Sequence, residues 1–209
     1  MKFAKTIFVI SLPHIRNAFF SFPPIARSKY IYFPFSSSTL FMSYTQTQNY
    51  RKEEPRMSDT LKAGDKAPDI EAETYDGNKI KLSDYRGKKT VALYFYPKDY
   101  TGTCTKEACS IRDGMKGLEK LGVQVLGVST DSVKSHEGFK EKHGLNFPLL
   151  SDKDKDIIKS YGVVSDSGSA RRETFLIDKT GVIRYIWTKV KATEHSGEIA
   201  EKVKELGLG

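Results

Sequence analysis

The stretch YFYPKDYTGTCTKEACSIRDG, residues 94–114, decides how this chain of 209 residues is interpreted. It begins within an apolar and aromatic run, residues 91–96, that is typical of a buried strand. It ends in a pattern of apolar residues that predicts a helix over residues 104–121. Both cysteines of the chain, Cys104 and Cys109, lie where the strand gives way to the helix. Any thiol chemistry must therefore take place at this junction.

Outward from this stretch, strands alternate with helices. A hairpin is predicted over residues 69–82, because Asp76-Gly77 is a strong turn signal. Further strands are predicted at 123–129, 147–150, 174–177 and 182–187, and further helices at 132–143, 154–161 and 194–206. This order predicts an α/β fold with a mixed central sheet flanked by helices, in which the last hairpin adds antiparallel edges to a parallel core.

The first 56 residues differ in composition from the rest. Residues 1–52 hold seven of the 34 Lys and Arg residues and no acid, which leaves 27 basic against 26 acidic residues in the remainder. We expect a disordered leader at residues 1–56 and a domain at residues 57–209. The leader resembles a transit peptide, which would place the protein in a mitochondrion or plastid. Alternatively, the start codon lies too far upstream, and a protein starting near Met57 would be cytoplasmic.

Composition also limits the partners and cofactors. The nearly neutral remainder argues against nucleic-acid binding, and no apolar run reaches the roughly 18 residues of a membrane-spanning helix. Two cysteines in a chain of this length fit a reducing compartment rather than a disulfide scaffold. The spacing of the cysteines and of His136, His143 and His195 matches no zinc-ligand pattern, so no metal is expected.

Cys104 is the candidate nucleophile. At the start of a helix, free N–H groups and the helix dipole favour a negative charge, so a thiolate is stabilised there. Thr101 can place a hydroxyl near the sulfur, and Pro97 stiffens the loop and can cover the sulfur from water. Other readings remain open: Cys104 as an inert buried thiol, and Thr101 as a helix-capping residue.

Cys109 follows five residues later. In a regular helix the two Cα atoms would be about 8.6 Å apart, whereas a disulfide needs roughly 4.4–6.8 Å. A bond between the two cysteines therefore requires the first helical turns to unwind. That geometry suits a transient disulfide better than a structural one, and Cys109 as a small core residue is the alternative.

The segment PKDYTGTC, residues 97–104, matches the P-x-x-x-T-x-x-C pattern of the peroxiredoxins. With Cys109 added, the chain resembles their Q-type subgroup, also called bacterioferritin comigratory proteins. The resemblance covers residues 58–207 and includes GDKAPDI (64–70), FPLLSD (147–152), RRETFLID (171–178) and IWTKVKATEH (186–195). One departure is that Gly102-Thr103 stands where the subgroup usually has Pro-Gly.

The resemblance implies a thioredoxin-like fold and a thiol peroxidase. Cys104 would be the peroxidatic cysteine that reduces hydrogen peroxide or an organic hydroperoxide and becomes a sulfenic acid. Cys109 would resolve it as a Cys104–Cys109 disulfide, which thioredoxin or a similar dithiol would reduce. Thr101 would bind the peroxide, Pro97 would shield the sulfenate, and the family's arginine would be Arg172.

The resemblance implies neither a metal nor an organic cofactor, and composition has already argued against a nucleic-acid or membrane partner. With the resolving cysteine in the same chain, a monomer is expected. Arg172 could instead be a surface charge, with its neighbour Arg171 as the alternative match. The competing functions are a disulfide oxidoreductase or redox sensor without significant peroxidase rate, and a binding or holdase role on the same scaffold.

Overall fold

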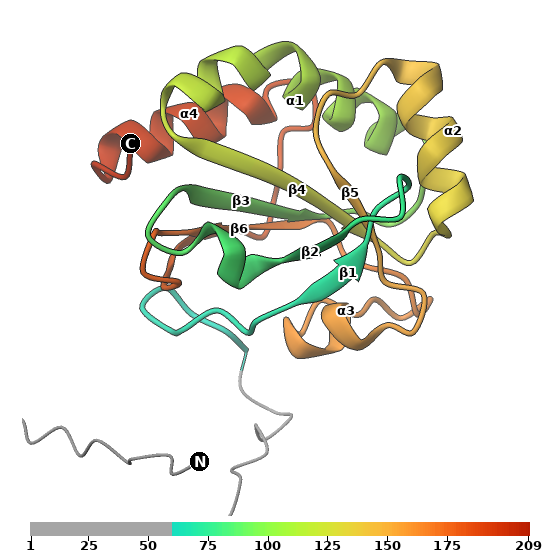
Figure 1. Ribbon diagram of the computed structural model, residues 1–209, viewed down its shortest axis with the longest axis horizontal. Helices are drawn as coiled ribbons and strands as arrows, with labels where there is room; N and C mark the ends of the chain where they lie inside the picture. Colours follow the sequence, from blue (N-terminus) through green and yellow to red (C-terminus); the bar gives the residue numbers. More distant parts are fainter. Residues whose placement is uncertain (1–59) are drawn as a thin grey trace, which may run out of the picture. The chain divides into compact units, whose positions relative to one another are not determined.

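The described part of the chain, residues 60–209 of the computed structural model, forms a five-stranded sheet with helices on both faces (Figure 1). The leader and domain boundary expected near residues 56 and 57 lie outside the described residues. The strands run in the order β5-β4-β3-β6-β7. Their bounds are β3 (Thr90–Phe95), β4 (Val123–Ser129), β5 (Leu149–Ser151), β6 (Glu173–Ile177) and β7 (Ile183–Trp187).

The predicted mixed sheet is confirmed. Strand β4 pairs in parallel with both β3 and β5, whereas β6 pairs antiparallel with both β3 and β7. The final hairpin therefore contributes one edge strand, β7, while β6 lies inside the sheet beside β3. This position matters, because it brings the residues just before β6 next to the end of β3.

The remaining elements follow the predicted order. They are the hairpin β1 (Glu71–Glu73) and β2 (Lys79–Lys81), the 3-10 helix η1 (Leu82–Tyr85), and the helices α1 (Gly102–Lys120), α2 (Val133–His143), α3 (Asp156–Ser160) and α4 (His195–Glu205). One difference affects the site: α1 begins at Gly102, not at the expected Cys104. Cys104 is thus the third residue of the helix and lies within its first turn.

Both faces of β3 are buried, which explains why its sequence is apolar throughout rather than alternating. Leu93 and Phe95 belong to a core that includes residues of α3 and of the hairpin strand β1. Tyr94 and Tyr96 point to the opposite core, which includes residues of α1 and α4. Figure 1 shows α1 and α4 together on one side of the sheet, with α3 and the hairpin on the other.

Helix α1 is packed unevenly along its length. In its middle, the Ser110 hydroxyl lies 3.3 Å from the Ser196 hydroxyl of α4. A Cβ atom added at Gly114 would overlap the Ser196 side chain, so the two helices approach closely there. By contrast, residues 101–103 at the start of α1 are exposed. The helix therefore contacts α4 closely beyond Cys109, whereas the residues just before Cys104 are exposed.

Candidate active site

A buried carboxylate, Asp99, holds the loop that leads from β3 into α1. It accepts hydrogen bonds from the Tyr96 hydroxyl at 2.8 Å and the Ser135 hydroxyl at 2.7 Å, and His136 Nδ1 lies 3.0 Å from it. Burial alone would raise the pKa of Asp99, but the contacts with His136, Ser135 and Tyr96 lower it below the ordinary 3.8. An ionised Asp99 thus ties the loop to α2.

Tyr100 makes a second connection between this loop and α2. Its backbone is left-handed, with φ 60°, which is uncommon for a bulky residue. Its ring meets the Phe139 ring edge-on with 5.2 Å between centroids. The loop is therefore fixed on its N-terminal side, just before the exposed residues that open α1.

Cys104 follows this loop in the first turn of α1, with only 1% of its surface exposed. Arg172 Nη2 donates a hydrogen bond to its Sγ at 3.1 Å. The side chain of Thr101, the N-cap residue of α1, makes no capping hydrogen bond, so the first N–H groups of the helix stay uncapped by it. Guanidinium and helix start both favour a negative charge on the sulfur.

The two neighbouring arginines, Arg171 and Arg172, have different partners, and only Arg172 contacts the thiol. Arg171 points away from the thiol: its guanidinium donates to Glu173 and to the backbone carbonyls of Gly162 and Val164. Arg172 lies one residue before β6, which pairs with β3, and its half-buried side chain reaches Cys104. The antiparallel pairing of β6 with β3 explains how residues distant in sequence meet.

Glu107 is a site residue that the sequence interpretation missed. Its side chain is fully buried and forms an ion pair with Arg172 Nη1, so one guanidinium contacts both the carboxylate and the thiol. Burial raises the Glu107 pKa from 4.5 to about 7, although Arg172 opposes the shift. A signal was available: Glu107 is three residues after Cys104, which places both on one face of a helix.

His195, to which the sequence analysis assigned no role, also belongs to this cluster. It is the first residue of α4 and is fully buried. Its Nε2 lies 2.8 Å from the Thr174 hydroxyl and 4.0 Å from Glu107 Oε1, and its Nδ1 lies 3.1 Å from Glu198. Burial lowers the pKa of His195, an effect that Arg172 reinforces and Glu198 opposes.

The other predicted site residues differ in how exposed they are. Pro97 is partly buried and follows the end of β3 closely. Thr101 is exposed, and its hydroxyl donates to the Lys98 carbonyl at 3.0 Å. Cys109 is a partly buried free thiol on α1. Because one continuous helix carries both cysteines, their Cα atoms are about 8.6 Å apart, and the unwinding needed for a disulfide stays a prediction.

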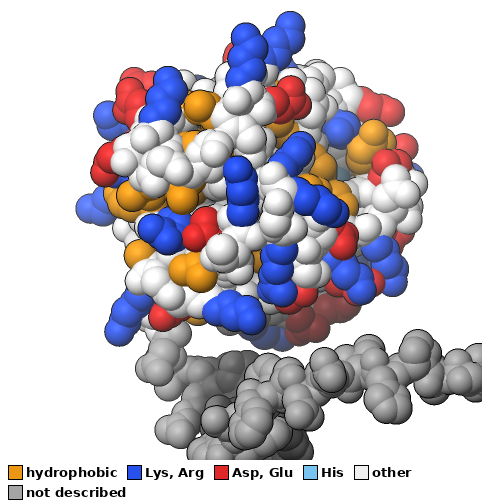
Figure 2. All heavy atoms as spheres, turned by 60° about the vertical axis from the view of Figure 1, so that its left-hand side comes forward, with side chains coloured by type: hydrophobic (Ala, Val, Ile, Leu, Met, Phe, Trp, Pro, Cys, Tyr) orange, Lys and Arg blue, Asp and Glu red, His pale blue; other side chains and the backbone are white. Residues whose placement is uncertain are grey.

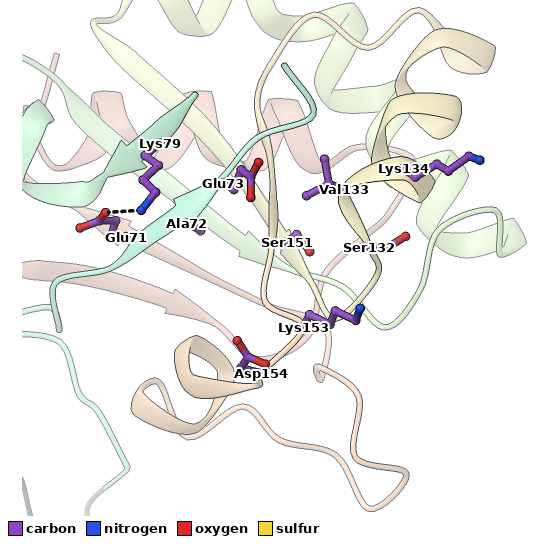
Figure 3. Close-up of a pocket in the computed structure, with 10 residues that line it drawn as sticks. All are labelled: Glu71, Ala72, Glu73, Lys79, Ser132, Val133, Lys134, Ser151, Lys153 and Asp154. Atoms are coloured by element: carbon purple, nitrogen blue, oxygen red, sulfur yellow. Dashed lines mark ion pairs between the residues drawn. The ribbon is translucent and has the colours of Figure 1, made fainter. Parts of the chain in front are cut away.

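A pocket of about 570 Å³ lies elsewhere, between the hairpin, the start of α2 and the segment after β5 (Figure 3). Its lining includes Glu71, Lys79, Ser132 and Lys153, and none of the residues around Cys104. Lys79 and Glu71, both on the hairpin, form an ion pair at 3.5 Å on one side of the pocket. Among residues 60–209, no group of three or more His, Cys, Asp or Glu residues could hold a metal ion.

The surface carries both signs of charge. On the face shown in Figure 2, Lys and Arg side chains are interspersed with Asp and Glu, and small apolar areas lie between them. No helix in the described part of the chain is long and apolar enough to cross a membrane.

Comparison with known proteins gives a consistent result. The model of the AhpC/TSA family matches residues 63–186. A putative peroxiredoxin bcp of Coxiella burnetii is 46% identical over 151 residues, covering 69% of this chain and 99% of that protein. The chloroplastic peroxiredoxin Q of Oryza sativa subsp. japonica is 38% identical over 146 residues, covering 68% of this chain and 67% of that protein.

Solved structures agree with the sequence relatives. Peroxidoxin BcpB from Mycobacterium tuberculosis superimposes with a TM-score of 0.66 at 29% identity, covering 70% of this chain and 98% of that one. A mutant of PrxQ from Xylella fastidiosa gives a TM-score of 0.67 at 33% identity, covering 72% of this chain and 99% of that one.

Proposed function

This chain belongs to the AhpC/TSA family and is a peroxiredoxin, and from that premise we propose that Cys104 is the residue that attacks the hydroperoxide. One observation carries the proposal: Arg172 Nη2 donates to the buried Cys104 Sγ at 3.1 Å, at the first turn of α1. The family accounts for the thioredoxin-like fold and for peroxidase activity. The assignment to this thiol follows from its charge environment.

The proposed reaction begins with the Cys104 thiolate. Its sulfur attacks the terminal oxygen of a hydroperoxide, the O–O bond breaks, and a sulfenic acid forms. The departing oxygen carries the electron pair of the broken bond and leaves as water or an alcohol once it takes up a proton. Arg172 lies beside the sulfur, so it can stabilise both the thiolate and the charge that develops on the departing oxygen.

Thr101 and Pro97 have roles that follow from their positions. The Thr101 hydroxyl, exposed at the N-cap of α1, is available to bind the peroxide once it leaves the Lys98 carbonyl. The first N–H groups of α1 are further donors for the peroxide oxygens. Pro97 is partly buried next to the end of β3 and limits access of water to the sulfenic acid.

Cys109 is the proposed resolving cysteine. Its thiol condenses with the Cys104 sulfenic acid, which releases water and leaves a disulfide. The first turns of α1 must unwind for this step, and the exposed segment at residues 101–103 is where unwinding is easiest. A dithiol of the thioredoxin type then reduces the disulfide in two exchange steps.

The experiment is a peroxide-dependent assay coupled to thioredoxin oxidation, with dimedone trapping of sulfenic acid read by mass spectrometry. Cys104→Ser should lose activity and trapping together. Cys109→Ser should accumulate trapped sulfenic acid at Cys104 and turn over slowly. Peroxide reduction by Cys104→Ser at the wild-type rate would refute the assignment of the nucleophile, and full turnover by Cys109→Ser would refute the resolving role.

Assembly and location are separate proposals. Because both proposed redox cysteines are in one chain, the protein is expected to act as a monomer, which light scattering coupled to size-exclusion chromatography measures. Its location depends on residues 1–56: cytoplasmic if the protein starts near Met57, mitochondrial or plastidic if those residues are a transit peptide. The mass of the N-terminus of the protein isolated from its native cells distinguishes the two.

A further inference from the structure

The Glu107 carboxylate is satisfied on one oxygen only. Its Oε2 pairs with Arg172, while its Oε1 is buried and has no hydrogen-bond partner among the described residues. Across from Oε1, His195 Nε2 lies 4.0 Å away. Burying a carboxylate oxygen without a hydrogen-bond donor costs free energy. A proton in the gap between Glu107 Oε1 and His195 Nε2 would remove this cost.

The contacts of His195 indicate where its own proton lies. Its Nδ1 faces the Glu198 carboxylate at 3.1 Å and therefore carries the hydrogen. In the neutral ring, Nε2 then has a lone pair, which accepts from the Thr174 hydroxyl at 2.8 Å. Two acceptors, Nε2 and Glu107 Oε1, thus face each other across the gap. One additional proton on either atom would convert this conflict into a favourable contact.

We infer that His195 is a positioning residue for the Cys104 thiolate. A proton shared between His195 Nε2 and Glu107 Oε1 decides whether the charge of Arg172 balances the thiolate or the Glu107 carboxylate. The inference rests on the proposed role of Cys104 as the nucleophile. With the proton in the gap, the His195–Glu107 pair is neutral overall, and Arg172 balances the thiolate. Without it, an ionised Glu107 competes for Arg172, and the buried thiolate is left with an uncompensated charge.

The surroundings contain few other groups that could take over this role. From β3, Tyr94 faces the cluster, and burial raises its pKa well above 10, so its hydroxyl stays neutral. From β7, the Trp187 ring meets the His195 ring at 5.7 Å, and from α4 Glu198 is the only carboxylate on His195 besides Glu107 among the described residues. The Glu107 pKa of about 7 means that the gap exchanges its proton near neutral pH.

The test measures the thiolate without any peroxide. In a Cys109→Ser background only Cys104 can react, since the chain has two cysteines. The rate of alkylation by iodoacetamide against pH gives the midpoint at which the thiolate forms. Glu107→Gln removes the competing charge and should lower this midpoint by about one unit, a tenfold gain in thiolate below the midpoint.

His195→Gln keeps a nitrogen near Oε1 that donates to an ionised Glu107 and cannot take up the shared proton. The midpoint should therefore rise by about one unit. In the Glu107→Gln/His195→Gln double variant the midpoint should equal that of Glu107→Gln alone, because His195 acts only through Glu107. His143→Gln on α2, outside this cluster, is the matched control and should leave the midpoint unchanged.

Three results would overturn the inference: a wild-type midpoint in Glu107→Gln, an unchanged or lower midpoint in His195→Gln, or additive shifts in the double variant. Should His195→Gln fail to fold, His195→Asn tests the same point, because asparagine likewise cannot take up the shared proton. An unchanged or lower midpoint in that variant would equally overturn the inference. Because alkylation needs no peroxide, a protein whose midpoints shift as expected but which lacks peroxidase activity would refute the proposed function and leave this inference standing.

Discussion

Replacing Glu107 with Gln should remove a loss of stability that the wild-type protein undergoes as the pH rises. Burial raises the pKa of Glu107 from 4.5 to about 7. A carboxyl whose pKa is higher in the folded than in the unfolded chain stabilises the fold below its unfolded pKa, and this contribution is lost as pH rises through the folded pKa. Glutamine keeps the shape of the side chain but has no proton to lose, so the variant lacks this dependence.

The size of the effect follows from the shift. A change from 4.5 to about 7 corresponds to roughly 3 kcal/mol when the titration is complete. Between about pH 5 and about pH 8 the expected loss is about 2.5 kcal/mol, because part of the titration lies below this range. For a domain of about 150 residues each kcal/mol changes Tm by roughly 2–4 °C, so Tm should fall by roughly 5–10 °C relative to the variant.

Thermal unfolding of the reduced proteins, followed by circular dichroism at constant ionic strength, measures this difference. Glu119→Gln, an exposed position on the same helix, is the control and should follow the wild type across the range. Wild-type and Glu107→Gln curves of Tm against pH that run parallel would refute the reasoning, since Glu107 would then titrate in the folded protein as it does in the unfolded chain.

Three further predictions concern the site and its support. Arg172→Lys should lower the rate constant for hydrogen peroxide by roughly 100-fold in stopped-flow kinetics, because lysine cannot contact carboxylate and thiol together; an equal loss in Arg171→Lys would contradict this. Asp99→Asn should destabilise the protein at neutral pH by about 1–3 kcal/mol in urea unfolding. Since the pKa of Asp99 is lowered in the folded protein, the stability difference between wild type and variant should shrink as pH falls below about 4. A stability difference that persisted in acid would contradict an ionised Asp99. Gly114→Ala should destabilise the protein by about 1–3 kcal/mol, because the added Cβ would overlap a serine of α4. Gly117→Ala on the same helix meets open space and should stabilise the protein by about 0.5–1 kcal/mol. Stability changes of the same sign for both variants would refute the packing argument.

Local sequence patterns predicted the elements and left their arrangement partly open. The apolar run at residues 91–96 indicated a buried strand because both faces of β3 pack against core. The start of α1 was placed two residues late, since Gly102-Thr103 are weak helix formers and the apolar period begins only after them. The position of β6 inside the sheet depends on long-range pairing with β3, which no local pattern encodes.

The residues of the candidate site likewise fall into those that local sequence indicated and those that only the tertiary structure brings together. The family motif pointed to Cys104 and Arg172, and the structure brings these two together. Glu107 could have been found from its spacing to Cys104 along one helix. His195 could not, because its contact with Glu107 exists only once α4 has docked on α1.

The uneven packing of α1 bears on how the protein withstands its own substrate. In the proposed mechanism, a sulfenic acid at Cys104 either reacts with a second peroxide to form a sulfinic acid, or condenses with Cys109 to form a disulfide. The second reaction requires the turns before Ser110 to open, while the contact of α1 with α4 lies beyond them. This opening must release the buried Cys104, Glu107 and Ala108 from the core, and the exposed residues 101–103 are where it can begin. On the proposed mechanism, the close contact with α4 limits the conformational change of each catalytic cycle to the start of α1, and the rest of the domain serves as a rigid frame for it.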